Sequence, residues 1–345
     1  MARISGNENN NQLTGTNNVD TIFGEGGNDT IRGRDAADTL FGGPGNDDLR
    51  PGDGGDRVYG GSGADVIASS EGTDRLFGGA NNDTANGGQD ADRIYGLGGD
   101  DSLYGDAGPD IVEGGGGADV LKGGTNTDTL RGGSDVDLLY GQDNQDLLFG
   151  GQGNDTLEGG GSEDRLYGGS DLDRLIGGEA ADLLYGGGQI DFLFGGDGSD
   201  LIDGGSGADR IYGQVGSDVI LAGEDQDSVF GGTDADTING GKGDDTIYGG
   251  TGGDTVAGDS GDDILEGDAN KDRLDGGSGA DTLRGEAGED LIYGYVGDDY
   301  AFGGAEDDRL FGGEGDDLLD GGRHHCRRRA RRRHRARNGY HSLNR

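Results

Sequence analysis

Aspartate recurs at every ninth position of this chain, from Asp20 to Asp317, in 34 consecutive repeats without an insertion or a deletion. Carboxylate oxygens are the ligands that calcium prefers, and pairs of carboxylates also serve as acids and bases in glycoside hydrolysis. Random low-complexity sequence does not keep such a register. The spacing therefore predicts a repetitive structure that presents the same carboxylate once in each repeat.

Glycine and aliphatic residues hold fixed places around each aspartate. The second residue after it is aliphatic, with only Ala85 and Ala301 as small exceptions, and the fifth residue before it is Gly except at Pro51, Ser69 and Ala222. The unit is G-G-x-G-x-D-x-U-x, where U is aliphatic. The segment x-U-x predicts a short strand whose central side chain points inward. The other six residues are predicted to turn the chain, because Gly supplies the positive-φ conformations of tight turns.

The third glycine of the unit, two residues before the aspartate, is replaced in 15 of the 34 repeats. Ten of the replacements are Asn or Asp, the non-glycine residues that best tolerate the left-handed region, so we predict a positive φ at this position. The other five do not fit this preference, and we expect weaker turns there. They are Ala36, Ser162, Ala180, Gln189 and Glu306.

Two repeats make one coil of 18 residues with two short parallel strands, and successive coils would stack about 4.8 Å apart. Aromatic residues recur with this 18-residue period and predict stacked ladders on opposite outer faces. They are Phe23, Phe41, Tyr59, Phe77 and Tyr95 in one phase, and Phe194, Tyr212, Phe230 and Tyr248 in the other. The predicted fold class is all-β, a parallel β-roll or right-handed β-solenoid of about 17 coils.

The roll is predicted to span residues 15–322. Residues 1–14 are expected to form an N-terminal cap or degenerate repeat, because Ile4 and Leu13 keep the aliphatic phase while Ala2 and Asn11 stand where Asp should be. Residues 323–345 form a basic tail that we expect to be disordered.

Composition excludes several classes of protein. The chain has 83 Gly among 345 residues and is 29% hydrophobic, and residues 1–322 contain all 69 acidic residues but 17 of the 27 Lys and Arg, a formal charge of −52. Such composition is typical of disorder, and only the unbroken period argues against it. Residues 1–322 contain no His or Cys, which excludes disulfides, Ser-His-Asp and Cys-His catalysis and zinc-hydrolase sites there. Because 34 equivalent aspartates single out no catalytic pair, we expect no enzyme. No apolar run is long enough to cross a membrane.

The tail holds ten Arg, all four His and the only Cys. One interpretation is binding to nucleic acid or an anionic membrane, although a rod of charge −52 argues against a nucleic-acid partner. Another is a soft-metal site made by His324, His325, Cys326 and His334, whose spacing matches no established site. We favour a third, a frameshift, because codons for Gly-Gly-Ala-Asp read two bases out of frame can encode Arg-Arg-Arg.

The repeat resembles the RTX, or hemolysin-type, nonapeptide of secreted bacterial proteins, over about residues 15–322. The resemblance implies a β-roll in which several calcium ions lie between turns of successive coils, held by Asp carboxylates and turn carbonyls. It also implies an extracellular location and type I secretion, although the tail does not resemble the C-terminal signal of that route. Stacked aspartates would repel one another by about 1–3 kcal/mol per unscreened pair, so we expect calcium binding and folding to be one event.

Calcium is predicted to favour one of the two rows of turns. The row from Asp29 to Asp317 keeps the third glycine in 12 of 17 repeats, and the row from Asp20 to Asp308 keeps it in 7 of 17. The candidate aspartate ligands are Asp29, Asp47, Asp56, Asp65, Asp74, Asp101, Asp119, Asp155, Asp200, Asp209, Asp218, Asp245, Asp254, Asp263, Asp281, Asp299 and Asp317. The candidate carbonyl ligands are Gly43, Gly45, Gly61, Gly63, Gly115, Gly117, Gly241, Gly243, Gly277, Gly279, Gly313 and Gly315.

Arginine directly follows the aspartate in eight repeats, and we expect these side chains to point outward and balance charge; replacement of missing calcium is a weaker hypothesis. They are Arg57, Arg75, Arg93, Arg165, Arg174, Arg210, Arg273 and Arg309. The predicted function is that of a secreted calcium-binding module that folds on binding calcium. The alternative is a cell-surface or matrix adhesin whose exposed aromatic ladders bind carbohydrate or protein. The expected partners are calcium and either a type I secretion apparatus or surface glycans.

Overall fold

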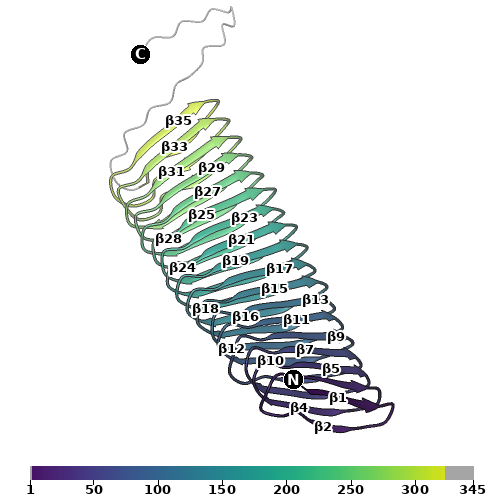
Figure 1. Ribbon diagram of the computed structural model, residues 1–345. Coiled ribbons are helices and arrows are strands. Elements are labelled where there is room, and N and C mark those ends of the chain that lie inside the picture. The colour runs from purple at the N-terminus through teal and green to yellow at the C-terminus, as the bar shows by residue number, and fades with distance from the viewer. Residues whose placement is uncertain (1, 323–345) are drawn as a thin grey trace, which may run out of the picture.

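The computed structural model describes residues 2–322, which form 36 β-strands stacked into a long rod (Figure 1). The odd-numbered strands make one 18-stranded sheet, sheet A, and the even-numbered strands make a second, sheet B. Every pairing is parallel and joins residues 18 apart, as Leu148 and Leu166 do in sheet A. The fold is therefore the predicted all-β parallel solenoid with 18 residues in each coil. No described residue belongs to a helix that could cross a membrane.

Sheet A has these strands: β1 Ala2–Asn7, β3 Asp20–Glu25, β5 Thr39–Pro44, β7 Arg57–Ser62, β9 Arg75–Ala80, β11 Arg93–Gly98, β13 Ile111–Gly116, β15 Thr129–Ser134, β17 Leu147–Gln152, β19 Arg165–Ser170, β21 Leu183–Gly188, β23 Leu201–Ser206, β25 Val219–Glu224, β27 Thr237–Lys242, β29 Thr255–Ser260, β31 Arg273–Ser278, β33 Leu291–Val296 and β35 Arg309–Glu314.

Sheet B has these strands: β2 Gln12–Thr14, β4 Thr30–Asp35, β6 Asp48–Asp53, β8 Val66–Ala68, β10 Thr84–Gln89, β12 Ser102–Ala107, β14 Val120–Thr125, β16 Leu138–Asp143, β18 Thr156–Gly161, β20 Arg174–Glu179, β22 Phe192–Asp197, β24 Arg210–Val215, β26 Ser228–Thr233, β28 Thr246–Thr251, β30 Ile264–Ala269, β32 Thr282–Arg284, β34 Tyr300–Phe302 and β36 Leu318–Asp320.

The prediction of three-residue strands and six-residue turns was wrong for most repeats. A typical strand such as β17 has six residues, so it runs through the two glycines and leaves a turn of three residues. The reason is that pairing with the next coil resumes after the first glycine, as the partners Leu148–Leu166 and Gly151–Gly169 show. Only five strands, among them β8, are as short as expected.

The N-terminal segment forms a complete first coil. Strand β1 pairs with β3 so that Ile4 lies opposite Ile22, and β2 pairs with β4 so that Leu13 lies opposite Ile31. Both side chains are partly buried against the core. The rod therefore has one more coil than the repeat count alone predicts.

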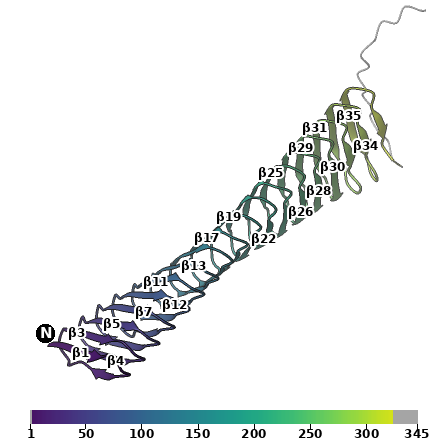
Figure 2. The same cartoon turned by 90° about the vertical axis from the view of Figure 1, so that its right-hand side faces the viewer.

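The core is a single file of aliphatic side chains from each sheet. The residue two places after each aspartate, from Ile22 to Leu310, is at most 1% exposed, including the small Ala85 and Ala301. Its neighbours in each strand point outward, as the pattern of Leu147, Leu148 and Phe149 in β17 illustrates. The rod twists along its length, and the strands of its two ends run in different directions (Figure 2).

Turn geometry follows the glycine pattern closely. At the third glycine position, 14 of the 15 replacements have positive φ, with Asn18 as the exception. The five residues expected to fit poorly adopt the same conformation, with φ between 73° and 88°. The second glycine position is also left-handed except at Thr16 and Ser70, even where Leu97 or Tyr295 occupies it.

The aromatic ladders are confirmed. Rings of successive coils stack with centroids 4.9–5.0 Å apart from Phe23 to Tyr95 on sheet A, and 4.9–5.1 Å apart from Phe194 to Tyr248 on sheet B.

Candidate metal sites

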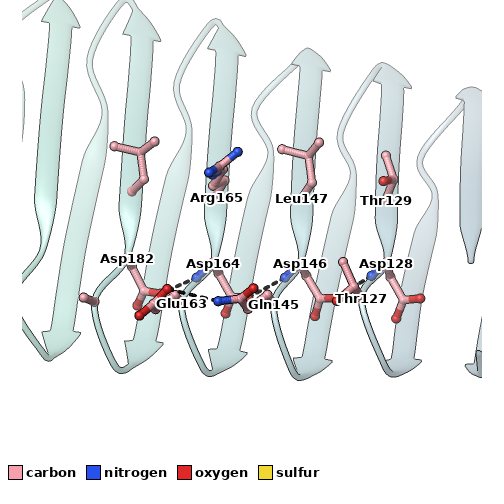
Figure 3. A pocket seen from close by; sticks show the side chains of 12 residues that line it. Thr127, Asp128, Thr129, Gln145, Asp146, Leu147, Glu163, Asp164, Arg165 and Asp182 are labelled. Atoms are coloured by element: carbon pink, nitrogen blue, oxygen red, sulfur yellow. Dashed lines mark hydrogen bonds between the residues drawn. The ribbon is translucent and has the colours of Figure 1, made fainter. Parts of the chain in front are cut away.

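Each repeat aspartate except Asp20 lies directly before a strand, at one edge of the rod, and its side chain points into the turn. One carboxylate oxygen, Oδ1, accepts a hydrogen bond from the backbone amide of the aspartate one coil earlier. In Figure 3 the amides of Asp128, Asp146 and Asp164 each donate in this way to the next aspartate, at 2.7 Å. The same bond recurs in every coil up to the amide of Asp299, which donates to Asp317 at 3.3 Å. Half of each carboxylate thus holds neighbouring coils together.

The other oxygen, Oδ2, has no such partner. In 31 of the 34 repeats it is buried and accepts no hydrogen bond; only Asp20, Asp74 and the half-buried Asp317 differ. A buried polar atom without a partner costs about 1–3 kcal/mol, and a carboxylate oxygen costs more. This arrangement therefore predicts that a proton or a cation accompanies these oxygens in the folded state.

The first glycine of the unit creates the space that Oδ2 occupies. A Cβ on Gly150 would lie 2.4 Å from Oδ2 of Asp155 and 2.7 Å from the carbonyl oxygen of Gly168 in the next coil. A carboxylate oxygen and a carbonyl oxygen thus face the same space beside the glycine, and this geometry repeats along both edges of the rod. Oxygen-only donors of mixed type suit calcium, which accepts flexible geometry, so the residues present fit the ion.

Carbonyl oxygens must supply part of any such site. Among residues 2–322, no three acidic, His or Cys side chains converge closely enough to hold a metal ion by themselves. The twelve glycines predicted as carbonyl ligands all have a positive φ, between 99° and 144°; six lie near the ends of strands and six in the turns that follow them. Their carbonyls stack along the rod, and a Cβ on Gly63 would lie 2.1 Å from the carbonyl oxygen of Gly45 one coil earlier.

Burial raises the pKa of nearly every repeat aspartate. Loss of solvation is the largest cause, and the bond from the preceding amide only partly offsets it. The pKa of Asp92, Asp128 and Asp182 rises to about 8, and that of Asp155 and Asp245 rises to about 6. Neighbouring aspartates raise several of these values further, as Asp110 and Asp146 do for Asp128. Metal-free carboxylates with the highest pKa, such as Asp128, therefore resist ionisation near neutral pH.

Two repeats satisfy Oδ2 with protein donors. Oδ2 of Asp20 accepts from the amide of Thr16 at 2.7 Å and from its hydroxyl at 2.8 Å, and these bonds hold the pKa of Asp20 below its usual value. Oδ2 of Asp74 accepts from the hydroxyl of Ser69, which stands where the first glycine should be. These two aspartates need a cation less than the others do.

The structure places all 17 predicted aspartates in two lines, one along each edge, and successive members of a line are joined through Oδ1. It does not separate the two rows, because Oδ2 lacks a donor on both, at Asp137 of the first row and at Asp128 of the second. The preference for the first row thus stays a prediction.

Many aspartates that the sequence reasoning left out are placed identically, among them Asp38, Asp83, Asp110 and Asp173. The unbroken nine-residue period was the signal that could have included them.

A surface groove of about 480 Å³ runs along one edge, past Asp128, Asp146, Asp164 and Asp182 (Figure 3). One wall includes Gln145, which donates to Glu163 at 3.0 Å. In these four coils the third glycine is replaced by Asn126, Asn144, Ser162 and Ala180. Loss of this glycine therefore changes neither the inward place of the aspartate nor the lack of a donor to Oδ2.

The arginines that follow the aspartates point outward, as predicted, and only Arg273 is half-buried. The raised pKa values of Asp56, Asp74 and Asp92 have burial as their largest cause, and no arginine is among the groups that lower them. This favours charge balance over replacement of calcium. The interpretations of the tail concern residues 323–345, which lie outside the described part of the chain.

Comparison with known families gave one clear result. The model of the RTX calcium-binding nonapeptide repeat matches residues 14–49, 51–85, 86–121, 122–157, 158–193 and 194–229, and overlapping stretches from 221 to 323. A search of curated proteins gave no significant match.

Proposed function

Since the chain belongs to the family of RTX calcium-binding nonapeptide repeats, we propose that residues 15–322 form a secreted module that folds only where calcium is abundant. The observation that carries this proposal is the buried Oδ2 atom that lacks a donor in 31 repeats. Oδ2 and the turn carbonyls would hold calcium, which supplies the positive charge that these buried carboxylates lack.

Without calcium, the folded rod is unfavourable at neutral pH whether its buried aspartates are ionised or protonated. Ionised aspartates would leave stacked, buried charges, and protonated ones must be held neutral at a pH near their raised pKa. The core contributes one aliphatic side chain per nine residues, which is little to offset either cost. We therefore expect a metal-free chain at neutral pH to remain unfolded, and binding and folding to occur together.

This coupling supports secretion as part of the proposal. Weak extracellular-type calcium sites fill at millimolar concentration and stay empty at cytosolic concentrations, so the chain would stay unfolded until export. Type I secretion and an extracellular location remain parts of the proposal that rest on the family.

Circular dichroism during a calcium titration tests the proposal. We expect a coil-like spectrum in chelator and a cooperative gain of β-structure as calcium approaches about 10 mM. Magnesium at the same concentration and sodium chloride at matched ionic strength are the controls, because screening alone would also weaken the repulsion. A β-rich spectrum in chelator at pH 7.5, or a coil spectrum at saturating calcium, would contradict the proposal.

The adhesin alternative receives little support from the ladders. Rings from Phe23 to Tyr95 are within 9° of parallel, and each inner ring turns its faces toward its neighbours. Arg3 lies 4.8 Å over the ring at the N-terminal end of this ladder. Ring faces that would stack on a sugar are therefore largely covered.

A further inference from the structure

Three arginines stack in successive coils on the outer face of sheet A. Arg57 of β7, Arg75 of β9 and Arg93 of β11 lie opposite one another in the parallel register, and all three are exposed. We call these residues the arginine stripe. Elsewhere in residues 2–322, arginines at this position of the repeat have no arginine in the adjacent coil.

The arginine stripe has no partner within the described chain. Strands β5, β7, β9 and β11 contain no acidic residue. Each arginine directly follows a repeat aspartate that is buried, and exposed acids lie three or four residues before the arginines, at Asp53, Glu71 and Asp90. No ion pair joins any of these acids to the stripe among the salt bridges of residues 2–322. None of the three guanidinium groups lies over a described aromatic ring, although Arg131, Arg174 and Arg273 do.

This placement costs stability, because like charges directly opposite each other in a sheet repel. The chain has 69 Asp and Glu, yet none of them is placed to form an ion pair with these arginines. Charges more than about 8–10 Å away are largely screened at physiological salt, so the formal charge of −52 on residues 1–322 acts only weakly at this face. An unpaired row of guanidinium groups with one group per coil is suited to an anionic ligand that repeats along the rod. Guanidinium pairs well with carboxylate, sulfate and phosphate groups.

The aromatic rings beside the arginine stripe limit which kind of polyanion can bind there. Tyr59, Phe77 and Tyr95 lie two residues after the three arginines and stack with centroids 4.9–5.0 Å apart. Proteins that bind single-stranded nucleic acid stack bases on exposed aromatic faces, and these faces are covered. A membrane would need a broad basic surface, whereas the arginine stripe is one residue wide. A linear acidic polysaccharide needs neither exposed ring faces nor a broad basic surface. The distance between its successive sugars is close to the distance between successive coils.

We propose that the face formed by β5, β7, β9 and β11 binds a linear acidic polysaccharide through the arginine stripe. The ligand lies along the rod axis, and its carboxylate or sulfate groups pair with Arg57, Arg75 and Arg93. The surface exists only in the folded rod, so this inference rests on the calcium-dependent folding proposed above.

The test compares two triple variants of the full chain in saturating calcium. One is Arg57→Ser, Arg75→Ser and Arg93→Ser; the control is Arg165→Ser, Arg174→Ser and Arg210→Ser, which changes the charge equally at unstacked positions of the repeat. Binding is followed by anisotropy of fluorescein-labelled chondroitin sulfate, with neutral dextran as the ligand control. Circular dichroism in chelator and in calcium shows whether each variant still folds.

We expect the stripe variant to bind chondroitin sulfate at least about tenfold more weakly than the wild type, with a shallower dependence on salt, while the control variant binds as the wild type does. Equal loss in both variants would show general charge attraction, and no loss in either would show bridging by calcium; both results overturn the proposal. So would tighter binding of the stripe to single-stranded DNA or anionic vesicles, or stripe-dependent self-association in sedimentation. A rod that does not fold in calcium would instead refute the proposed folding.

Discussion

The hydroxyl of Ser69 donates a hydrogen bond to Oδ2 of Asp74, the carboxylate oxygen that lacks a donor at Asp56 and Asp92 on either side. Serine here occupies the space that the first glycine leaves open in other repeats. A protein donor thus takes the place that a cation would have, as it also does at Asp20, and this repeat offers a natural test of the site.

Ser69→Gly is expected to create a metal site at Asp74. Removal of the hydroxyl leaves Oδ2 without a donor and opens the space beside the backbone, as at Gly150 before Asp155. Native mass spectrometry at saturating calcium should then count one more bound ion than in the wild type. Ser70→Gly, an exposed neighbour in the same loop, is the matched control and should leave the count unchanged. An unchanged count in Ser69→Gly would show that the glycine space does not determine occupancy.

Acid should replace calcium in folding the chain. Burial raises the pKa of most repeat aspartates, to about 6 at Asp155 and to about 8 at Asp128, so the folded state holds these protons more tightly than the unfolded state. Stability of the metal-free fold is therefore greatest below the unfolded pKa and falls as pH rises through the folded values. Circular dichroism in chelator should show β-structure gained between pH 8 and pH 5. A coil spectrum that persists at pH 5 would count against the buried carboxylates as the cause.

Substitution of Asp146 should separate the two roles of the carboxylate. Asp146→Asn keeps an Oδ1 acceptor for the amide of Asp128, whereas Asp146→Ala leaves that buried amide without a partner. In saturating calcium we expect Asp146→Ala to lose about 1–3 kcal/mol more unfolding free energy than Asp146→Asn. Urea unfolding followed by circular dichroism measures the difference. Equal losses would mean that the bond between coils contributes nothing beyond calcium binding.

Ala180→Gly should stabilise the rod. Ala180 has a φ of 77°, a conformation that costs an L-residue about 1–2 kcal/mol, while glycine adopts it freely at a smaller cost in entropy. We expect a net gain of about 0.5–1 kcal/mol in urea unfolding with calcium present. Ala181→Gly, next to it and without a positive φ, should destabilise instead. A loss in both variants would show that the turn is not strained.

Much of the fold could be predicted because its contacts repeat with the sequence period. The inward file of residues such as Leu148, the 18-residue register and the aromatic ladders all follow from which residue types recur nine or 18 positions apart. Strand length could not be predicted in this way. The intrinsic preference of glycine predicts that the glycines of β17 lie in a turn, but backbone pairing with the neighbouring coil makes them part of the strand.

The sequence by itself determined the period, the solenoid, the positive-φ turns and the family of calcium-binding repeats, because each depends on residue type at a fixed spacing. Only the tertiary structure decided that Oδ1 of one aspartate binds the amide of another a full coil away and that Oδ2 is left without a donor. It also decided that Ser69 donates a hydrogen bond to the Oδ2 atom of Asp74 and that three arginines lie on one face. These relationships join residues that meet only when coils stack, and burial, which gives them their energy, exists only in the folded rod.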